Sequence, residues 1–212
     1  MSSGQERITA LLHEHPIISG MITRRQLEIV LSHLHQVLEA QVHGAVVELG
    51  CCMGTTSLFI RRLLDARESR RRFIVYDSFL GLPAKRAEDE SLDGSIVREG
   101  SCKCEREVLL ANFHQAGLRP PEIREGWFRA LPARSYPESI AFAFLDGDFY
   151  QSIWDSLNIV YPRLSRGGVI VMHDYSSLML PGVERACSEF LRGKAEEGHV
   201  TKQELIGAFH KR

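Results

Sequence analysis

Two short apolar runs, separated by one helical pattern, constrain the fold of this chain more than any other feature. The runs are Ile140–Leu145 and residues 168–172, and both are rich in the β-branched and aromatic residues typical of buried strands. Between them, residues 152–164 repeat apolar side chains at helical spacing. The order strand, helix, strand predicts two parallel, neighbouring strands whose carboxyl ends lie at one edge of a sheet.

Acidic residues follow both of these predicted strands. Asp146 and Asp148 come directly after the first, and His173 and Asp174 come directly after the second. Ligands of open α/β sheets bind at this edge, and clustered carboxylates with an imidazole are typical of a divalent metal site. The alternative is purely structural: Asp148 caps the following helix and Asp174 begins a turn.

The rest of the chain continues the alternation of strands and helices. This pattern predicts an α/β, Rossmann-like fold with a mostly parallel sheet and helices on both faces. Residues 1–40 are interpreted as an N-terminal helical extension, with an amphipathic helix at 23–40, and residues 41–212 as the main domain. The other expected strands are 45–50, 73–77 and 121–126, the other helices are 55–64, 105–116 and 182–191, and the tail at 200–210 is expected to add one antiparallel strand.

Length and charge restrict the possible partners. The 212 residues fit one α/β domain with a short extension, and the net charge of −1 gives no general attraction to nucleic acid or to a membrane surface. The arginines at 70–72 are interpreted as the end of a helix. Five cysteines without paired metal spacing, no signal peptide and no membrane span predict a cytoplasmic protein with reduced thiols.

The turn after the first strand of the main domain indicates which cofactor binds. A nicotinamide-binding turn requires G-x-G-x-x-G, but Cys52 occupies the second glycine position and only Gly50 and Gly54 remain. The strand carries Glu48, and the next strand ends in Asp77, an acid that can accept ribose hydroxyls. Two acids and no pyrophosphate turn favour S-adenosylmethionine, whose sulfonium and ammonium are cationic. The alternative is a scaffold that binds no nucleotide.

Seven motifs in order give the chain a family resemblance. They are VELG at 47–50, YDSFLGLP at 76–83, EGWF at 125–128, LDGDFY at 145–150, YPRLSRGG at 161–168, HDY at 173–175 and LPGV at 180–183. As a set they resemble the macrocin O-methyltransferase family over residues 40–195. That family has a class I methyltransferase fold and methylates sugar or phenol hydroxyls of antibiotics with the help of a metal.

The resemblance implies a role for each matching residue. It implies that S-adenosylmethionine and a divalent metal, magnesium or else manganese, are the cofactors, and that the acceptor is a small-molecule hydroxyl compound. The implied assignments are Glu48, Gly50 and Gly54 at the cofactor turn, Asp77 and Ser78 at the ribose, Gly126 and Trp127 along the adenine, and Asp146, His173 and Asp174 at the metal.

One departure from the family leaves the general base open. The family has two aspartates where this chain has His173 and Asp174, so one oxygen ligand is replaced by nitrogen. The related catechol-type enzymes have a lysine base where this chain has Phe149. His173 and His114 are the candidate bases, and His173, with Asp146 as its catalytic partner, is favoured because it lies at the predicted metal edge.

The predicted reaction is methyl transfer to an acceptor hydroxyl. Residues 78–101 are too long for an ordinary loop and are interpreted as a flap that closes over the acceptor together with the helix at 23–40. That helix is also a possible homodimer contact. The remaining alternatives are a metal-independent methyltransferase and a non-catalytic protein that binds S-adenosylmethionine; a nicotinamide oxidoreductase is disfavoured by the missing glycine.

Overall fold

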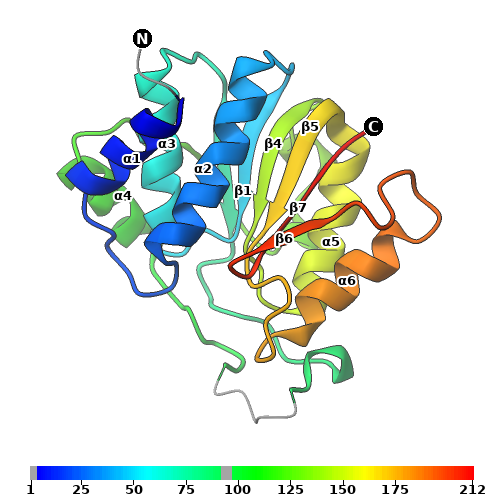
Figure 1. Cartoon of the computed structure of the whole chain (residues 1–212). Coiled ribbons are helices and arrows are strands. Elements are labelled where there is room, and N and C mark those ends of the chain that lie inside the picture. The colour runs from blue at the N-terminus through cyan, green and yellow to red at the C-terminus, as the bar shows by residue number, and fades with distance from the viewer. Residues whose placement is uncertain (1–3, 92–96) are drawn as a thin grey trace.

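A seven-stranded, mostly parallel sheet forms the centre of the molecule. The computed structural model describes residues 4–91 and 97–212, and its strands lie in the order β3-β2-β1-β4-β5-β7-β6 (Figure 1). Among the described strands, β7 runs opposite to the other six, because its pairings with β5 and β6 are both antiparallel. The strands are β1 Ala45–Leu49, β2 Phe73–Asp77, β3 Glu122–Glu125, β4 Ile140–Leu145, β5 Leu164–Met172, β6 Thr201–Gln203 and β7 Ile206–His210. The predicted α/β fold is confirmed.

Helices cover both faces of this sheet, as Figure 1 shows. The first four cover one face and the last two cover the other. They are α1 Gly4–Glu14, α2 Arg24–Glu39, α3 Thr55–Ala66, α4 Arg106–Gln115, α5 Tyr150–Val160 and α6 Pro181–Leu191. Within these described residues, no helix is both long and apolar enough to cross a bilayer.

The alternation of side chains along each strand divides the core into two layers. Phe142 and Phe144 of β4 belong to the layer under α2 and α3, whereas Ala143 and Leu145 belong to the layer under α5 and α6. All four side chains have no exposed surface. This is the consequence of the two-residue period of a strand whose two faces are both covered.

The N-terminal helices pack on the sheet rather than standing apart from it. Leu27, Leu31 and Leu34 of α2 are fully buried and share one core cluster with residues of β1 and β4. α2 begins as expected, with Thr23 as N-cap in a capping box with Gln26. The helix α1 was not predicted, because Ile8 and Leu12 are its only buried residues and the rest of its pattern is polar.

Three sequence expectations differ from the structure. The helix expected at 152–164 is α5 followed by a 3-10 turn at Tyr161–Arg163, and β5 already begins at Leu164, with an irregular pairing before Val169. The tail forms the hairpin β6–β7 instead of a single strand. The arginines at 70–72 do not end a helix, because α3 ends at Ala66 and they directly precede β2.

Candidate active site

The predicted acidic cluster forms where β4 and β5 end. The two strands are parallel with Leu145 opposite Met172, so the next residues, Asp146 and His173, are neighbours. His173 Nδ1 lies 2.9 Å from Asp146 Oδ1 and 3.2 Å from Asp174 Oδ2. The strand register therefore delivers all three side chains to one volume at the lower end of the sheet in Figure 1.

The buried histidine and its acidic neighbours perturb one another's pKa values. Burial alone lowers the pKa of His173, but Asp146, Asp174 and Asp148 raise it to about 9. Burial raises the pKa of Asp174, and His173 partly offsets this effect. Burial, together with Asp146 and Asp174, raises the pKa of Asp148 well above its ordinary range. The neighbouring carboxylates thus favour the charged form of His173, against the effect of its burial.

The donor set of this cluster fits a divalent metal ion. One ligand atom from each of Asp146, His173 and Asp174 can be chosen so that all lie within 4.8 Å of one another. Two carboxylates suit magnesium or manganese, and the imidazole adds a nitrogen that manganese accepts more readily. The Nε2 atom of His173 is buried and has no hydrogen-bond partner in the described part of the chain. A metal-bound histidine usually donates from its second nitrogen, so this ligand lacks the usual support.

Asp148 does not cap the following helix, so that structural alternative is wrong. Asp174 does begin a turn, as its structural alternative predicted. Asp148 makes no capping bond to α5; Asp89, far away in sequence, accepts from the amide of Tyr150 instead. Asp148 has a left-handed φ of 59°, and its half-buried side chain lines the cavity described below. Asp174 has a φ of 52°, and its carbonyl accepts from the amide of Ser177 in a turn. Two non-glycine residues with left-handed backbones in one site mark it as locally strained.

The glycine turn after β1 passes directly beside this cluster. Gly50 has a φ of 88°, and a Cβ atom there would lie 1.9 Å from the carbonyl oxygen of Asp146. Only glycine allows this approach. Gly54 begins α3 with a φ of 87° and faces Leu109 of α4 rather than the cavity.

Asp77 holds this turn in place through its side chain. Its Oδ2 atom accepts from the amides of Cys51 and Cys52, both at 2.8 Å, and its Oδ1 atom accepts from the amide of Phe79 at 2.8 Å. Each carboxylate oxygen has more than one acceptor position, so the side chain can still receive a hydroxyl from a ligand. Asp77 therefore shapes the turn as well as lining the cavity.

Glu48 lies beneath the turn as a buried acid. Its side chain is 1% exposed and accepts from the hydroxyl of Ser57 on α3. Burial, together with Asp146 and Asp77, raises the pKa of Glu48 well above its ordinary range. Because burial disfavours the ionised form of Glu48, a cationic ligand group beside it would stabilise that form.

A cavity of about 250 Å³ brings most of the predicted site residues together. Gly54, Gly126 and His114 are not among the described residues that line it; Gly126 lies between β3 and Trp127, and His114 is exposed on α4. The sequence interpretation assigned no role to several lining residues, among them Ser19, Met21, Cys51, Cys102 and Phe128. Asp148 was expected in the acidic cluster at the strand ends, and it lines the cavity there. The predicted site residues that do line the cavity are Glu48, Gly50, Asp77, Ser78, Trp127, Asp146, His173 and Asp174.

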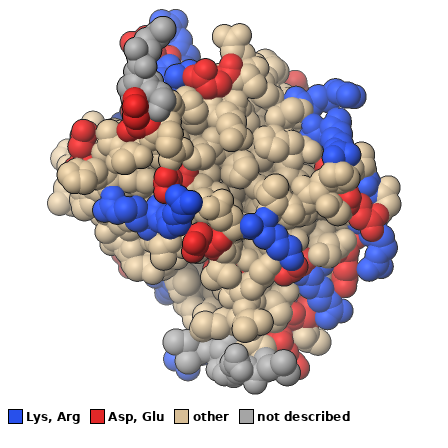
Figure 2. Space-filling model, in the orientation of Figure 1, with Lys and Arg blue, Asp and Glu red and all other residues tan. Residues whose placement is uncertain are grey.

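The cavity is acidic. Five carboxylates line it, from Glu48, Asp77, Asp146, Asp148 and Asp174, and its described lining contains no lysine or arginine. Figure 2 shows lysine and arginine on several parts of this face of the molecule, most densely along its right-hand margin. The acidic lining of the cavity suits a cationic cofactor and disfavours phosphate-bearing ligands.

The predicted flap is tied down at several points. Leu82 donates to the carbonyl of Ser101, and Gly100 donates back to the carbonyl of Leu82, at 2.8 and 2.9 Å. Asp89 is 1% exposed and bonded to α5. Residues 92–96 of the flap lie outside the described residues. Backbone hydrogen bonds thus join the two ends of the flap, and Gly81, Leu82 and Pro83 near its start line the cavity.

Comparisons with known proteins agree with this geometry. A sequence model of the macrocin-O-methyltransferase (TylF) family matches residues 4–212. The chain is 33% identical over 162 residues to the 8-demethyl-8-(2,3-dimethoxy-α-L-rhamnosyl)-tetracenomycin-C 4′-O-methyltransferase of Streptomyces olivaceus, with 74% of this chain and 62% of that protein covered. It is 30% identical over 176 residues to the demethyldecarbamoylnovobiocin O-methyltransferase of Streptomyces niveus, with 80% and 66% covered. The chain thus spans slightly less than two thirds of these two relatives.

Solved structures show the same fold. The O-methyltransferase NovP superposes with a TM-score of 0.78 at 26% identity, covering 90% of this chain and 81% of that one. The calicheamicin methyltransferase CalS11 superposes with a TM-score of 0.71 at 21% identity, covering 98% and 91%. The second likeness concerns the fold alone. The class I methyltransferase fold expected from the sequence motifs is confirmed.

Proposed function

The chain belongs to the macrocin-O-methyltransferase family, and from this premise we propose that it transfers a methyl group from S-adenosylmethionine to a hydroxyl of a small molecule. The observation that carries the proposal is the acidic cavity in which the glycine turn and Asp77 meet Asp146, His173 and Asp174. The name of the Streptomyces olivaceus relative specifies a rhamnosyl-bearing compound, which makes a sugar hydroxyl the first acceptor to test.

Residues of the first two strand ends would hold S-adenosylmethionine. Gly50 lets the turn approach closely, and Asp77 with Ser78 would receive the ribose hydroxyls. Gly126 and Trp127 would lie along the adenine; Trp127 is 40% exposed, so its ring is available for such a contact. When bound, this cofactor supplies an electrophilic methyl group on a cationic sulfur, and buried Glu48 offers a carboxylate to that charged end.

Asp146, Asp174 and His173 would hold a divalent ion, either magnesium or manganese. Such an ion lowers the pKa of an acceptor hydroxyl and orients it. The two carboxylates form the core of the proposed site, with His173 as the third ligand. A metal-independent enzyme is the alternative, favoured by the ion-pair distances of 2.9 and 3.2 Å from His173 to the same two carboxylates.

Asp148 is better suited than His173 to act as the general base. As a metal ligand, His173 would have its coordinating nitrogen occupied by the ion, and without the metal its pKa of about 9 keeps it protonated at neutral pH, so in neither state is it a free base. The pKa of Asp148 is raised instead, mainly by burial, which brings a carboxylate closer to the range in which it accepts a proton efficiently. The acceptor oxygen would attack the methyl carbon as its proton passes to Asp148, and the cofactor would leave as neutral S-adenosylhomocysteine.

One set of measurements tests these assignments. Production of S-adenosylhomocysteine is followed with a panel of glycosides and phenols, with added magnesium, with added manganese and with a chelator. We expect turnover with a glycoside, its loss with the chelator, and its loss in Asp148→Asn with cofactor binding retained. Full activity in the presence of the chelator would favour the metal-independent alternative.

Binding measurements, combined with turnover, distinguish a methyltransferase from a protein that only binds S-adenosylmethionine. Calorimetric titration should show S-adenosylmethionine binding and no NAD binding. Binding without turnover for any acceptor in the panel would favour the non-catalytic alternative. Absence of S-adenosylmethionine binding would contradict the whole proposal. The mass of the protein in solution tests whether the chain forms a homodimer.

A further inference from the structure

A second concave region lies at the opposite edge of the sheet from the active site. It is a groove of about 1030 Å³ formed by the segments that precede β1, β2 and β4 and by the turn before β5. The strand β1 has five residues, so its two ends are roughly 16 Å apart. A ligand in this groove therefore occupies a site separate from the methyl-transfer cavity.

Five arginines line this groove, and four of them have no counterion. Arg72 forms a two-pronged ion pair with Glu122, at 2.9 and 2.8 Å. No described carboxylate lies within ion-pair distance of the other four, and Glu138 is the only acidic residue in the described lining. The four are Arg70, Arg71, Arg134 and Arg163.

Two of these four guanidinium groups are held in place by the protein. Arg71 donates from Nη1 to the carbonyl of Gly44 at 2.8 Å, and Arg163 donates from Nη1 to the carbonyl of Ile159 at 2.7 Å. Arg163 also lies over the ring of Tyr136, 5.8 Å from its centroid. A guanidinium has five N–H donors, so both retain donors for a ligand. Arg70 and Arg134 are exposed and complete the rim.

Four like charges around one groove repel each other unless an anion lies among them. A concave surface lined by one sign of charge also concentrates its field and attracts counterions. Guanidinium forks match the oxygens of phosphate in a two-pronged geometry. The groove is far larger than one phosphate ion, and its unpaired arginines come from three separate segments of the chain.

We propose that this groove is a second ligand site, which binds a small anion containing two linked phosphate groups. Such a ligand bridges arginines of different segments, which a single phosphate does not. The acidic methyl-transfer cavity, with five carboxylates and no arginine or lysine in its described lining, has the opposite preference. The proposal does not depend on the methyl-transfer reaction.

The test uses inorganic pyrophosphate with the full chain in metal-free buffer at low salt. We expect pyrophosphate to raise the melting temperature of the parent protein and to bind more tightly than orthophosphate. The double variant Arg70→Gln/Arg134→Gln should bind pyrophosphate at least about tenfold more weakly, a loss of roughly 1.4 kcal/mol. Binding of S-adenosylhomocysteine, measured in the same samples, should be unchanged.

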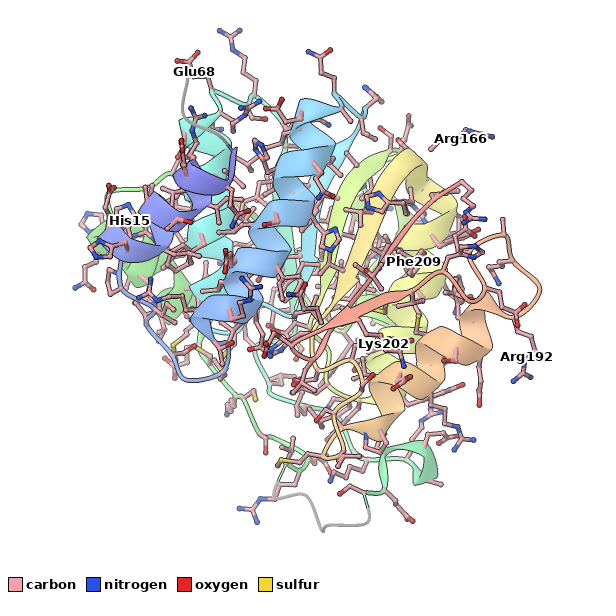
Figure 3. All side chains as sticks on the ribbon, viewed as in Figure 1. His15, Glu68, Arg166, Arg192, Lys202 and Phe209 are labelled. Carbon is pink, nitrogen blue, oxygen red and sulfur yellow. The ribbon has the colours of Figure 1, made fainter. Side chains whose placement is uncertain are left out.

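A matched double variant removes the same charge elsewhere. Arg119 and Arg192 are both exposed and outside the groove, and Figure 3 shows Arg192 projecting beyond the end of α6. Arg119→Gln/Arg192→Gln should bind pyrophosphate as the parent does. An equal loss in both double variants would mean diffuse attraction to net charge and would overturn the proposal.

Two other outcomes would also overturn it. One is the absence of any pyrophosphate effect on the parent protein. The other is binding of polyglutamate, but not of pyrophosphate, that depends on Arg70 and Arg134; this would identify the groove as a surface for an acidic protein. A crystal soaked with pyrophosphate, with density beside Arg71 and Arg163, would locate the ligand directly.

Discussion

The carboxylate of Asp89 accepts a hydrogen bond of 2.6 Å from the backbone amide of Tyr150, 61 residues later in the chain. Tyr150 is the first residue of α5, where backbone amides lack partners within the helix. Asp89 is 1% exposed and belongs to the segment that leaves β2. One side chain thus ties this segment to the helix that follows Asp146 and Asp148, and so joins two walls of the cavity.

Replacing Asp89 should weaken both the fold and the site. Asp89→Ala leaves the amide of Tyr150 without its partner, and we expect a loss of about 1–2 kcal/mol in the free energy of unfolding. We also expect weaker cofactor binding, because the segment that carries Leu82 and Pro83 along the cavity loses its attachment. Urea unfolding and calorimetry measure the two effects. The control is Glu90→Gln, a change of the same charge at an exposed neighbour; equal stability of the two variants would contradict the prediction.

Asp77 should be essential for cofactor affinity. Asp77→Ala removes the acceptor proposed for the ribose and also frees the amides of Cys51, Cys52 and Phe79. The loss of a charge-assisted hydrogen bond predicts S-adenosylmethionine binding weaker by about 1.5–3 kcal/mol. Titration calorimetry measures this loss, and Asp77→Asn separates turn support from charge. If Asp77→Ala binds the cofactor as tightly as the parent, the ribose assignment is wrong.

The sequence predicts local structure and strand-end chemistry well in this chain. Strand β2 was expected at its observed bounds, and Asp146 and His173 meet as expected because parallel strands in register end together. The apolar period of two and the helical period are properties of short windows. They are therefore readable without knowledge of the fold.

Contacts between distant segments could not be predicted. Nothing near Asp89 indicates that it caps α5, because its partner is 61 residues away. The direction of Asp148 depends on a left-handed backbone that residue preferences disfavour. It was likewise not predictable that no described carboxylate pairs with Arg70 or Arg71, since a run of arginines does not reveal which carboxylates the fold brings near.

The metal assignment predicts loss of metal binding for one substitution in the cluster and a change of metal preference for another. Asp146→Asn should remove most affinity for manganese while cofactor binding remains, because one of two anionic ligands becomes neutral. His173→Asp should shift preference from manganese toward magnesium, because a carboxylate oxygen suits the harder ion. Metal titrations monitored by calorimetry and by manganese resonance measure both.

Exposed acids provide the control for that experiment. Asp65→Asn removes one negative charge on α3, far from the cluster in the fold, and should leave metal affinity unchanged. A manganese-soaked crystal without an anomalous peak between Asp146 and Asp174 would rule out the metal site. His173→Asp with unchanged metal preference would show that His173 is not a ligand.

His33 should make the protein less stable in mild acid. It lies on α2 facing β7, with the ring of His210 5.9 Å from its own. Burial, with a smaller effect of His210, lowers the pKa of His33 to about 4. Between pH 6.5 and pH 4 the unfolded chain therefore binds a proton that the native chain does not. The free energy of unfolding contributed by this site falls as pH falls through that range, by on the order of 2–3 kcal/mol at pH 4.

A comparison of two histidine variants isolates this effect from the carboxylates that titrate in the same range. His33→Gln removes the buried imidazole, whereas His13→Gln removes an exposed one on α1. Urea unfolding at a series of pH values should give a shallower loss of stability for His33→Gln than for the parent, and the same loss as the parent for His13→Gln. Equal slopes for all three proteins would mean that His33 is protonated in the native state and that the environment between α2 and β7 does not exclude its charge.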